Sequence, residues 1–461
     1  MQTFRRLSLP ELERCVDSYL PVPLLSAEEE GLNSRERIYS LRLTFQCFVW
    51  QTLKPKTSCR EVVRQVQALF RLKGHRRVKK GTGGYCQARS RLPKERLEKA
   101  LTHSAQEADR RAGPSRWLRG RAIKVADGTT TQSADTPRNQ KHYPQSPHQR
   151  KSCGFPLMKL LVLFSLSSGA VVQTIVGNRH HHDLRLFRQL WDELKTGDIV
   201  LGDRLFSDYA TLAALPKRGI DVLARVNVKR KIDFRQAQRL GRNDGLFVWK
   251  KPTCCPPYLT SAQWAQMPTT MTVRVVRFQA AHKGFRTRQI TLATTLLDPK
   301  LYPLEELAAV YARRWRLELC IRDLKTQMGM EQLRAQSPEM AQKELLAYLI
   351  AHNLVRCVMA EATARYDVDL ERLSFKGTVD SLRQFSQAMA QAPTRRKRQQ
   401  LWEDLLETIA TDLVPLRPGR REPRALKRRP KPFPRLIVPR HQFKDPLPYN
   451  KWLRQQAAVK N

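Results

Sequence analysis

The sequence has few acidic residues for its size and no cysteine pattern typical of a disulfide framework or a zinc site. Its 42 Asp and Glu stand against 84 Lys and Arg, which gives a formal net charge of +42. None of the nine cysteines forms a C-x-x-C pair, which favours a reducing cytoplasm over a secreted fold. The first residues, MQTFRRLSLPELERC, lack the apolar segment of a secretory signal.

Long uninterrupted hydrophobic runs are also missing. The most apolar stretch, residues 155–177, is interrupted by Lys159, by Gln173 and by the Ser-Ser-Gly at 167–169. A membrane span is therefore not expected. The stretch instead predicts two buried strands around a tight turn.

The chain is nevertheless long enough, at 461 residues with 41% hydrophobic, for two or three domains and a sizeable core. A compact particle of charge +42 repels itself unless a polyanion neutralises it. Nucleic acid is the favoured polyanion, bound through its phosphates. A membrane surface is the alternative, although no sustained basic amphipathic helix supports it.

Three regions follow from the patterning, and the first spans residues 1–115. Apolar positions recur every three or four residues in RIYSLRLTFQCFVWQTL and REVVRQVQALFRL, which predicts helices. The basic segment KGHRRVKKGTGG reads as a loop between helices of a DNA-binding region. An ordinary solvated loop is the alternative.

The second region, residues 116–360, alternates between strand and helix patterns, which indicates a mixed α/β layer fold. RAIKVAD and GDIVLGD predict strands that end in Asp127 and Asp203, and residues 227–298 predict a β-rich insertion. One long helix is expected from about Pro303 to Gly329, followed by a buried helix up to Tyr366. The third region, residues 361–461, is helical at first and becomes a basic, proline-rich arm after Pro415.

The stretch YARRWRLELCIRDLK, residues 311–325, has an unusual arrangement for a surface helix. At about 100° per residue, one sector of roughly 60° holds its four notable polar residues, which are Tyr311, Arg314, Glu318 and Lys325. The neighbouring apolar sector can bury, and comprises Leu317, Cys320, Ile321, Leu324 and Met328. Asp323 lies about 120° from Tyr311 and reads as ordinary surface. An ion-pair ladder of Glu318 with Arg314 and Arg322 is the simpler alternative.

Carboxylates at two strand ends suggest what Glu318 could do. Asp127 and Asp203 could simply belong to a hairpin turn and a helix cap, respectively. Adjacent strands can also place two carboxylates within a few ångströms, where like charges need a cation. A third carboxylate from the helix would complete an oxygen-rich site for Mg²⁺. Two such ions about 4 Å apart can activate water and stabilise a leaving 3′-oxygen in phosphodiester cleavage.

The spacing Y-x2-R-x3-E-x6-K in this helix resembles the signature of bacterial DDE transposases of the insertion sequence four family. Further segments look like that family, in the right order from about residue 80 to 440. They are YCQARSRLP, VADGTTTQSADTPRNQKHYPQ with the later GFP, VLGDRLFSDY, and KRRPKPFP.

The resemblance implies a ribonuclease H-like catalytic core with a β-rich insertion, flanked by the helical region and the basic arm. It also implies a DDE triad of Asp127, Asp203 and Glu318 that binds two Mg²⁺ ions, with Mn²⁺ as a substitute. Tyr311, Arg314 and Lys325 would contact the cleaved DNA end, including a hairpin intermediate with a flipped base.

Several residues keep two interpretations. Trp315 could support a flipped base or belong to the core, and Trp249 or Trp264 in the insertion could support the base instead. The tract His180–Asp183 could bind a metal, but a polar helix start is favoured. Asp183 and Asp208 compete for a place in the triad, although both read as helix caps.

These observations predict a cut-and-paste DNA transposase. It would bind the terminal inverted repeats of its element, cleave them, pass through a hairpin and join the 3′-ends to target DNA. We expect no membrane association, a homodimer formed before or on double-stranded DNA, and a location in the bacterial cytoplasm with the nucleoid. The alternatives are a ribonuclease H-like nuclease that hydrolyses without joining, and a non-catalytic DNA-binding protein.

Overall fold

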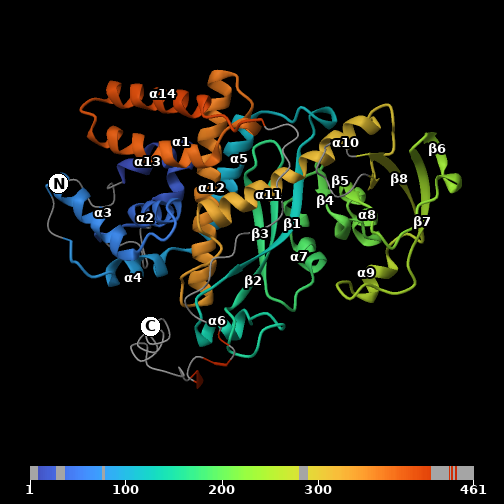
Figure 1. The fold of residues 1–461 in the computed structure, drawn as a ribbon, viewed down its shortest axis with the longest axis horizontal. Helices are drawn as coiled ribbons and strands as arrows, with labels where there is room; N and C mark the ends of the chain where they lie inside the picture. Colours follow the sequence, from blue (N-terminus) through green and yellow to red (C-terminus); the bar gives the residue numbers. More distant parts are fainter. Residues whose placement is uncertain are drawn as a thin grey trace, which may run out of the picture.

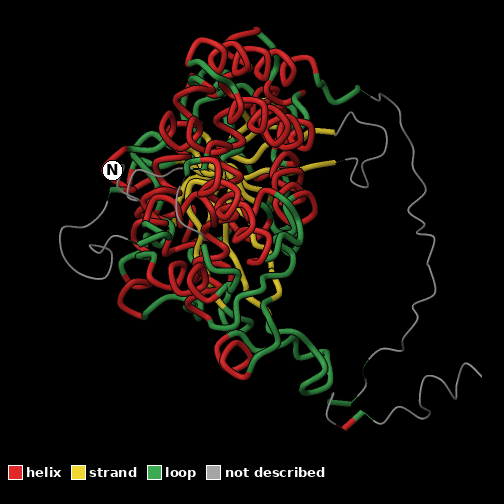
Figure 2. Tube along the Cα trace, turned by 90° about the vertical axis from the view of Figure 1, so that its left-hand side faces the viewer, coloured by secondary structure: helices red, strands yellow, loops and turns green. Residues whose placement is uncertain are grey.

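The computed structural model describes residues 9–26, 37–74, 78–279 and 289–416, with isolated positions between 436 and 443. A nine-stranded sheet runs through it in the order β3-β2-β1-β4-β5-β9-β8-β7-β6. Seen from the side, the strands lie in the middle of the body with helices around them (Figure 2). The expected mixed α/β architecture with a large sheet is therefore present.

The first five strands form one side of the sheet, from its edge strand β3 to β5 (Figure 1). They are β1 (Ile123–Gln132), β2 (Leu157–Ser165), β3 (Val171–Gly177), β4 (Ile199–Gly202) and β5 (Asp221–Arg225). β1 and β3 pair antiparallel with β2, whereas β4 pairs parallel with both β1 and β5. The two buried strands predicted in residues 155–177 are confirmed as β2 and β3, and Gly169 provides the left-handed turn between them with φ +72°.

The prediction that β1 ends in Asp127 is wrong. The strand continues to Gln132, and Asp127 pairs with Val162 in the middle of the ladder. Its polar second half stays extended because Leu157–Leu161 provides a continuous partner for residues 128–132. The alternative that Asp127 and Gly128 form a hairpin turn is excluded by the same pairing.

The insertion at residues 227–298 is β-rich, as predicted. It contains β6 (Gln238–Gly241), β7 (Asp244–Lys250), β8 (Thr270–Gln279) and β9 (Gln289–Thr294), with α9 (Ser261–Ala265) between β7 and β8. β9 pairs antiparallel with β5, so these strands extend the central sheet. The guanidinium of Arg274 is fully buried, binds the Asp244 carboxylate at 2.8 Å and donates to the Tyr302 carbonyl at 2.7 Å. This buried pair fixes the insertion to the segment that leads into the next helix.

Each face of the sheet has its own hydrophobic core. Val125 and Leu201 point into the larger core, which α5 and α12 also line, whereas Ala126 and Val200 point to the opposite core beneath α7 (Asp183–Gln189) and α8 (Tyr209–Ala214). Side chains alternate between the faces of a strand. Asp127 therefore lies on the same face as Val125.

The helices before β1 agree with the predicted pattern. They are α1 (Pro10–Tyr19), α2 (Leu41–Leu53), α3 (Cys59–Leu72), α4 (Gly83–Arg91) and α5 (Lys94–Ala112), and α6 (Pro137–His142) follows β1. The predicted basic loop joins α3 to α4, with residues 75–77 outside the described part. α2 and α5 pack directly on α12 (Pro338–Tyr366), and α1 packs on α13 (Phe375–Gln391) (Figure 1). The predicted division into three regions stays a prediction.

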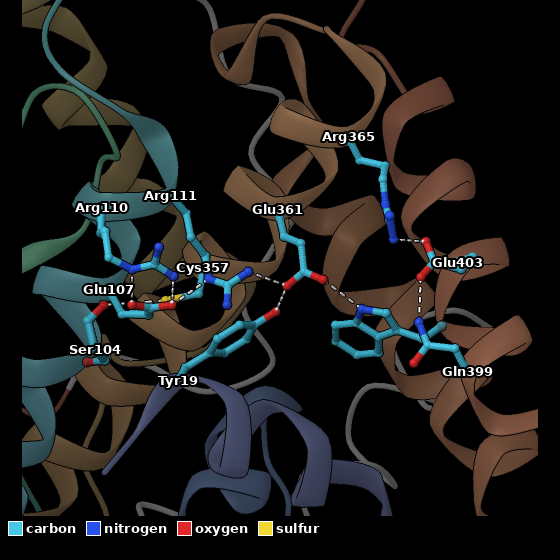
Figure 3. Close-up of polar contacts among 11 residues, drawn as sticks. Tyr19, Ser104, Glu107, Arg110, Arg111, Cys357, Glu361, Arg365, Gln399 and Glu403 are labelled. Atoms are coloured by element: carbon cyan, nitrogen blue, oxygen red, sulfur yellow. Dashed lines mark hydrogen bonds and ion pairs between the residues drawn. The ribbon is translucent and has the colours of Figure 1, made fainter. Parts of the chain in front are cut away.

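A polar cluster holds the helices from both ends of the chain together (Figure 3). The Glu361 carboxylate on α12 accepts hydrogen bonds from Tyr19 at 2.8 Å, from Arg111 at 2.7 Å and from the indole of Trp402 at 2.9 Å. These residues belong to α1, α5 and α14 (Arg395–Thr411), respectively. One partly buried carboxylate thus joins four helices.

Within the described residues, α12 is the one helix long and apolar enough to cross a membrane, but 94% of its apolar window is buried in the protein. This confirms the buried helix expected up to Tyr366. The basic arm predicted after Pro415 lies almost entirely outside the described residues.

Candidate active site

Asp127 and Asp203 come from neighbouring parallel strands. The last recorded β1–β4 partners are Val125 and Leu201, so two further residues place Asp127 level with Asp203. The strand predicted to end in Asp203 is β4, which ends one residue earlier at Gly202, so that Asp203 directly follows it. Its Oδ1 accepts a hydrogen bond from the Leu205 backbone at 2.8 Å, so the alternative of a cap is also correct.

The single long helix predicted from Pro303 to Gly329 is wrong. α10 (Leu304–Arg313) and α11 (Trp315–Arg322) are separated at Arg314, and Asp323–Gln327 form a π-helical turn. At the break, Arg314 N donates to Tyr311 O and Leu317 N donates to Arg314 O, a tighter pattern than in an α-helix. The predicted polar face assumed regular α-helical spacing. That spacing is interrupted twice, at Arg314 and at the π-helical turn.

Arg314 connects two of the three candidate carboxylates. One guanidinium nitrogen lies 3.9 Å from Asp127 Oδ2, and another lies 3.4 Å from Glu318 Oε1. The Tyr311 ring centroid is 6.0 Å from Arg314 Cζ. The structure therefore brings Tyr311, Arg314, Glu318 and Asp127 together, and the ion pair of the simpler alternative is one part of this arrangement.

Asp203 and Glu318 both act electrostatically on Asp127. Burial raises the pKa of Asp127 to about 6; the Arg314 charge opposes this shift, and the charges of Asp203 and Glu318 add to it. Burial also raises the pKa of Tyr311, against the effect of Arg314 and Arg225. Like charges that share one site favour binding of a cation.

The donor set fits a divalent metal ion by its chemistry, because three carboxylates provide the oxygen ligands that Mg²⁺ and Mn²⁺ prefer. In the part of the chain that the structure describes, no three His, Cys, Asp or Glu side chains are already arranged around one ion position. Instead, Arg314 supplies the positive charge between Asp127 and Glu318. Closure around a metal would require this guanidinium to move away.

Lys325 has a different environment from the rest of its signature. It lies in the π-helical turn, and burial lowers its pKa while the charge of Glu331 opposes that shift. A π-helical residue advances less around the axis than an α-helical one. Its predicted place beside the DNA end stays a prediction.

The tryptophans separate clearly by exposure. Trp315 is 50% exposed at the helix break, so its interpretation as a core residue is wrong. Trp249 and Trp264 are 4% and 7% exposed and pack in the core on the far face of the sheet. Neither can support a flipped base without leaving that core, and the alternative placed in the insertion is wrong.

Asp183 and Asp208, the competitors for a place in the triad, both lie at helix starts. His182 Nδ1 accepts a hydrogen bond from the Leu184 backbone and caps α7, and Asp208 caps α8 through the Thr211 backbone. Asp183 is the first residue of α7, so its prediction as a cap is wrong, and its carboxylate pairs with Lys159 at 2.9 Å. The polar helix start predicted for His180–Asp183 and the cap predicted for Asp208 are confirmed.

Two arginines at the site were not predicted. Arg204 directly follows Asp203, and Arg225 is the last residue of β5. Burial lowers the pKa of Arg225, and the positive charges of Arg204 and Arg314 lower it further. Their positions at the ends of β4 and β5, the next two strands of the sheet after β1, were the signal in the sequence that could have revealed them.

The prediction that Asp323 is ordinary surface is wrong. It is 6% exposed, and its carboxylate lies 3.6 Å from the equally buried guanidinium of Arg356 on α12. Arg356 also contacts Cys320 Sγ at 3.2 Å. The pair thus fixes the turn after α11 against α12.

Asp323→Ala is expected to lower the free energy of unfolding by about 3 kcal/mol, because Arg356 would remain buried without its partner. Urea denaturation followed by circular dichroism measures this loss. The double variant Asp323→Ala with Arg356→Met is the control and should recover part of the stability. A double variant less stable than the single one would contradict a structural role for the pair.

Comparison with known proteins agrees with this geometry. Residues 119–354, just over half of the chain, match the family described as Transposase DDE domain. The chain belongs to the DDE transposases. The resemblance deduced from the signature is thereby confirmed, and the protein is an enzyme that acts on DNA.

Among its relatives, this transposase is similar to Transposase InsG for insertion sequence element IS4 from Escherichia coli (strain K12). The two are 25% identical over 428 residues, which cover 90% of this chain and 92% of the relative. Among solved structures, the piggyBac transposase synaptic complex with hairpin DNA aligns over 92% of this chain and 89% of its own, with a TM-score of 0.43 and 11% identity.

Proposed function

We propose that Asp127, Asp203 and Glu318 are the catalytic and metal-binding triad of this transposase. The observation that carries the proposal is their convergence from β1, from the end of β4 and from α11 on one face of the sheet. The strands β3-β2-β1-β4-β5 form the ribonuclease H-like core in this proposal. β6 to β9 are its insertion.

The metal is a divalent ion, as in DDE transposases generally; we infer two Mg²⁺ ions, with Mn²⁺ as a substitute. Such ions, when bound, lower the pKa of water and stabilise charge on the leaving oxygen. The role of the chain is to hold the three carboxylates together. Arg314, which pairs with Asp127 and Glu318, would exchange these partners for a DNA phosphate. Arg suits that exchange because its planar guanidinium binds carboxylate and phosphate alike.

Binding of the DNA end falls to the basic groups around the triad. Arg314 and Lys325 belong to the family signature, and Arg225 lies within electrostatic reach of Tyr311, Arg204 and Arg314. In this proposal, the three arginines and Lys325 together match a phosphate backbone that carries one charge per nucleotide. Trp315 offers a half-exposed ring for an extruded base.

The reaction is cleavage at the terminal inverted repeats of the element, through a hairpin, followed by joining of the 3′-ends to target DNA. Attack at phosphorus needs no covalent protein intermediate. Synapsis of two ends implies a homodimer, assembled before or on the DNA, in the cytoplasm near the nucleoid. Incubation with the flanking element ends and Mg²⁺ tests all steps, with cleavage, hairpins and joined products scored in one assay. Hydrolysis without hairpins or joining would reject the strand-transfer part.

Trp315→Ala is expected to leave the melting temperature nearly unchanged, because half of the side chain is exposed. Loss of one base-stacking contact, worth about 1–3 kcal/mol, should weaken the complex with a cleaved or hairpin end about tenfold or more. Fluorescence anisotropy with a hairpin-ended duplex measures the change. Leu319→Ala, at another exposed apolar residue of α11, is the matched control and should bind as wild type.

A further inference from the structure

Two cysteines far from the carboxylates come together between α3 and α4. Cys59 is the first residue of α3, and Cys86 lies in α4, which packs against α3. One guanidinium nitrogen of Arg89 lies 3.3 Å from Cys59 Sγ and 3.7 Å from Cys86 Sγ. Both thiols are half-buried, so a small reagent can reach them.

The surroundings favour one thiolate and one thiol. A hydrogen bond from Cys59, together with the charge of Arg89, lowers the pKa of Cys86 to about 5. The same hydrogen bond, with burial, raises the pKa of Cys59. Thiolates react with oxidants, whereas thiols do not. Cys86 is thus suited to react first and Cys59 to react second.

We propose that Cys59 and Cys86 form a peroxide-sensitive dithiol that closes to a disulfide between α3 and α4. The proposal rests on two thiols from separate helices that share one arginine. Reversible redox-sensing disulfides are the kind found in a reducing cytoplasm. The proposed dithiol is independent of the triad and of the reaction at the DNA ends.

The chemistry requires only hydrogen peroxide as the oxidant. The Cys86 thiolate attacks one peroxide oxygen, so an S–O bond forms, the O–O bond breaks and hydroxide leaves. The sulfur loses two electrons and the peroxide gains them. The Cys59 sulfur then attacks the Cys86 sulfur; an S–S bond forms, the S–O bond breaks, and the Cys59 proton leaves with the hydroxyl group as water.

The consequence is a covalent link across a loop that the sequence makes strongly basic. The segment between α3 and α4 is KGHRRVKKGT, residues 73–82. A disulfide would fix the relative position of the two helices that this segment joins. Reduction by a thiol would release them again.

The test uses the full-length, reduced protein at pH 7 with one equivalent of hydrogen peroxide. Peptide mapping without reductant is expected to find Cys59 joined to Cys86 and two thiols lost per chain. Cys254 is the internal control, because its thiol is more exposed and should remain free. Absence of the link, or loss of Cys254 at the same rate, would overturn the proposal.

Single substitutions separate the two roles. In Cys59→Ser, a cyclic 1,3-diketone should trap a sulfenic acid on Cys86, whereas in Cys86→Ser the thiol of Cys59 should persist. The rate of Cys86 oxidation should change less than twofold between pH 6 and 8. Free cysteine, with a pKa of about 8.5, should speed up by roughly tenfold per pH unit over the same range. If the oxidation rates of Cys86 and of free cysteine showed the same pH dependence, the assignment of Cys86 as a thiolate would be rejected.

Discussion

Glu318→Gln is expected to reduce cleavage of element ends by about 10³-fold or more and to leave DNA binding intact. The amide keeps the shape of the side chain but removes one of three negative charges that would hold the metal. A loss of about 4 kcal/mol of transition-state stabilisation corresponds to this factor. Single-turnover cleavage of a labelled end measures the rate, and a mobility-shift assay measures binding.

Glu305→Gln is the matched control for this experiment. Glu305 is an exposed glutamate in the first turn of α10, the helix that precedes α11. The control should cleave at the wild-type rate. Magnesium-dependent cleavage by Glu318→Gln within tenfold of wild type would remove Glu318 from the triad.

Asp127→Asn is expected to stabilise the protein while abolishing cleavage. Burial raises the pKa of Asp127 from 3.8 to about 6, which corresponds to a cost of at most about 3 kcal/mol for the charged form. The folded protein then binds more protons than the unfolded chain between those values, so the cost develops as the pH rises from about 4 to 6. Without metal, the variant should melt about 2–4 °C higher than wild type at pH 7.5 and equally at pH 3.5.

Thermal melts in a chelator at the two pH values check the sign of this effect. Added Mg²⁺ should then raise the melting temperature of wild type and leave that of Asp127→Asn unchanged, since only the former would bind the ion. Asp192→Asn is the control, because that carboxylate is 82% exposed. A variant that melts below wild type in chelator at pH 7.5 would show that the buried charge is not destabilising.

Short-range patterns predicted much of the fold. Two apolar runs around a Ser-Ser-Gly turn became β2 and β3, and the buried helix up to Tyr366 became α12. The spacing around Glu318 also led to the correct family, because a signature depends on chemistry more than on helix geometry. The aspartate at the end of β4 needed only the local pattern of a short apolar strand.

Three of the errors depend on contacts between distant residues. The second half of β1 is polar, and its extended form depends on β2, which begins 25 residues after β1 ends at Gln132. Asp323 is buried because Arg356 on another helix meets it. The helix break at Arg314 likewise brings the guanidinium towards Asp127 on β1. Helical periodicity is derived from one segment alone, so it gives no information about these distant partners.

The four-helix junction at Glu361 also constrains how the chain can be made. α1 and α5 leave the ribosome long before α12, whose residues they need as packing partners. Their apolar surfaces therefore lack this packing partner while more than 200 further residues are synthesised. Exposed hydrophobic surface favours aggregation during that period. A copy of the element whose reading frame stops before residue 338 would yield a fragment without its central helix. We expect proteases to degrade such a fragment before it can compete for DNA ends.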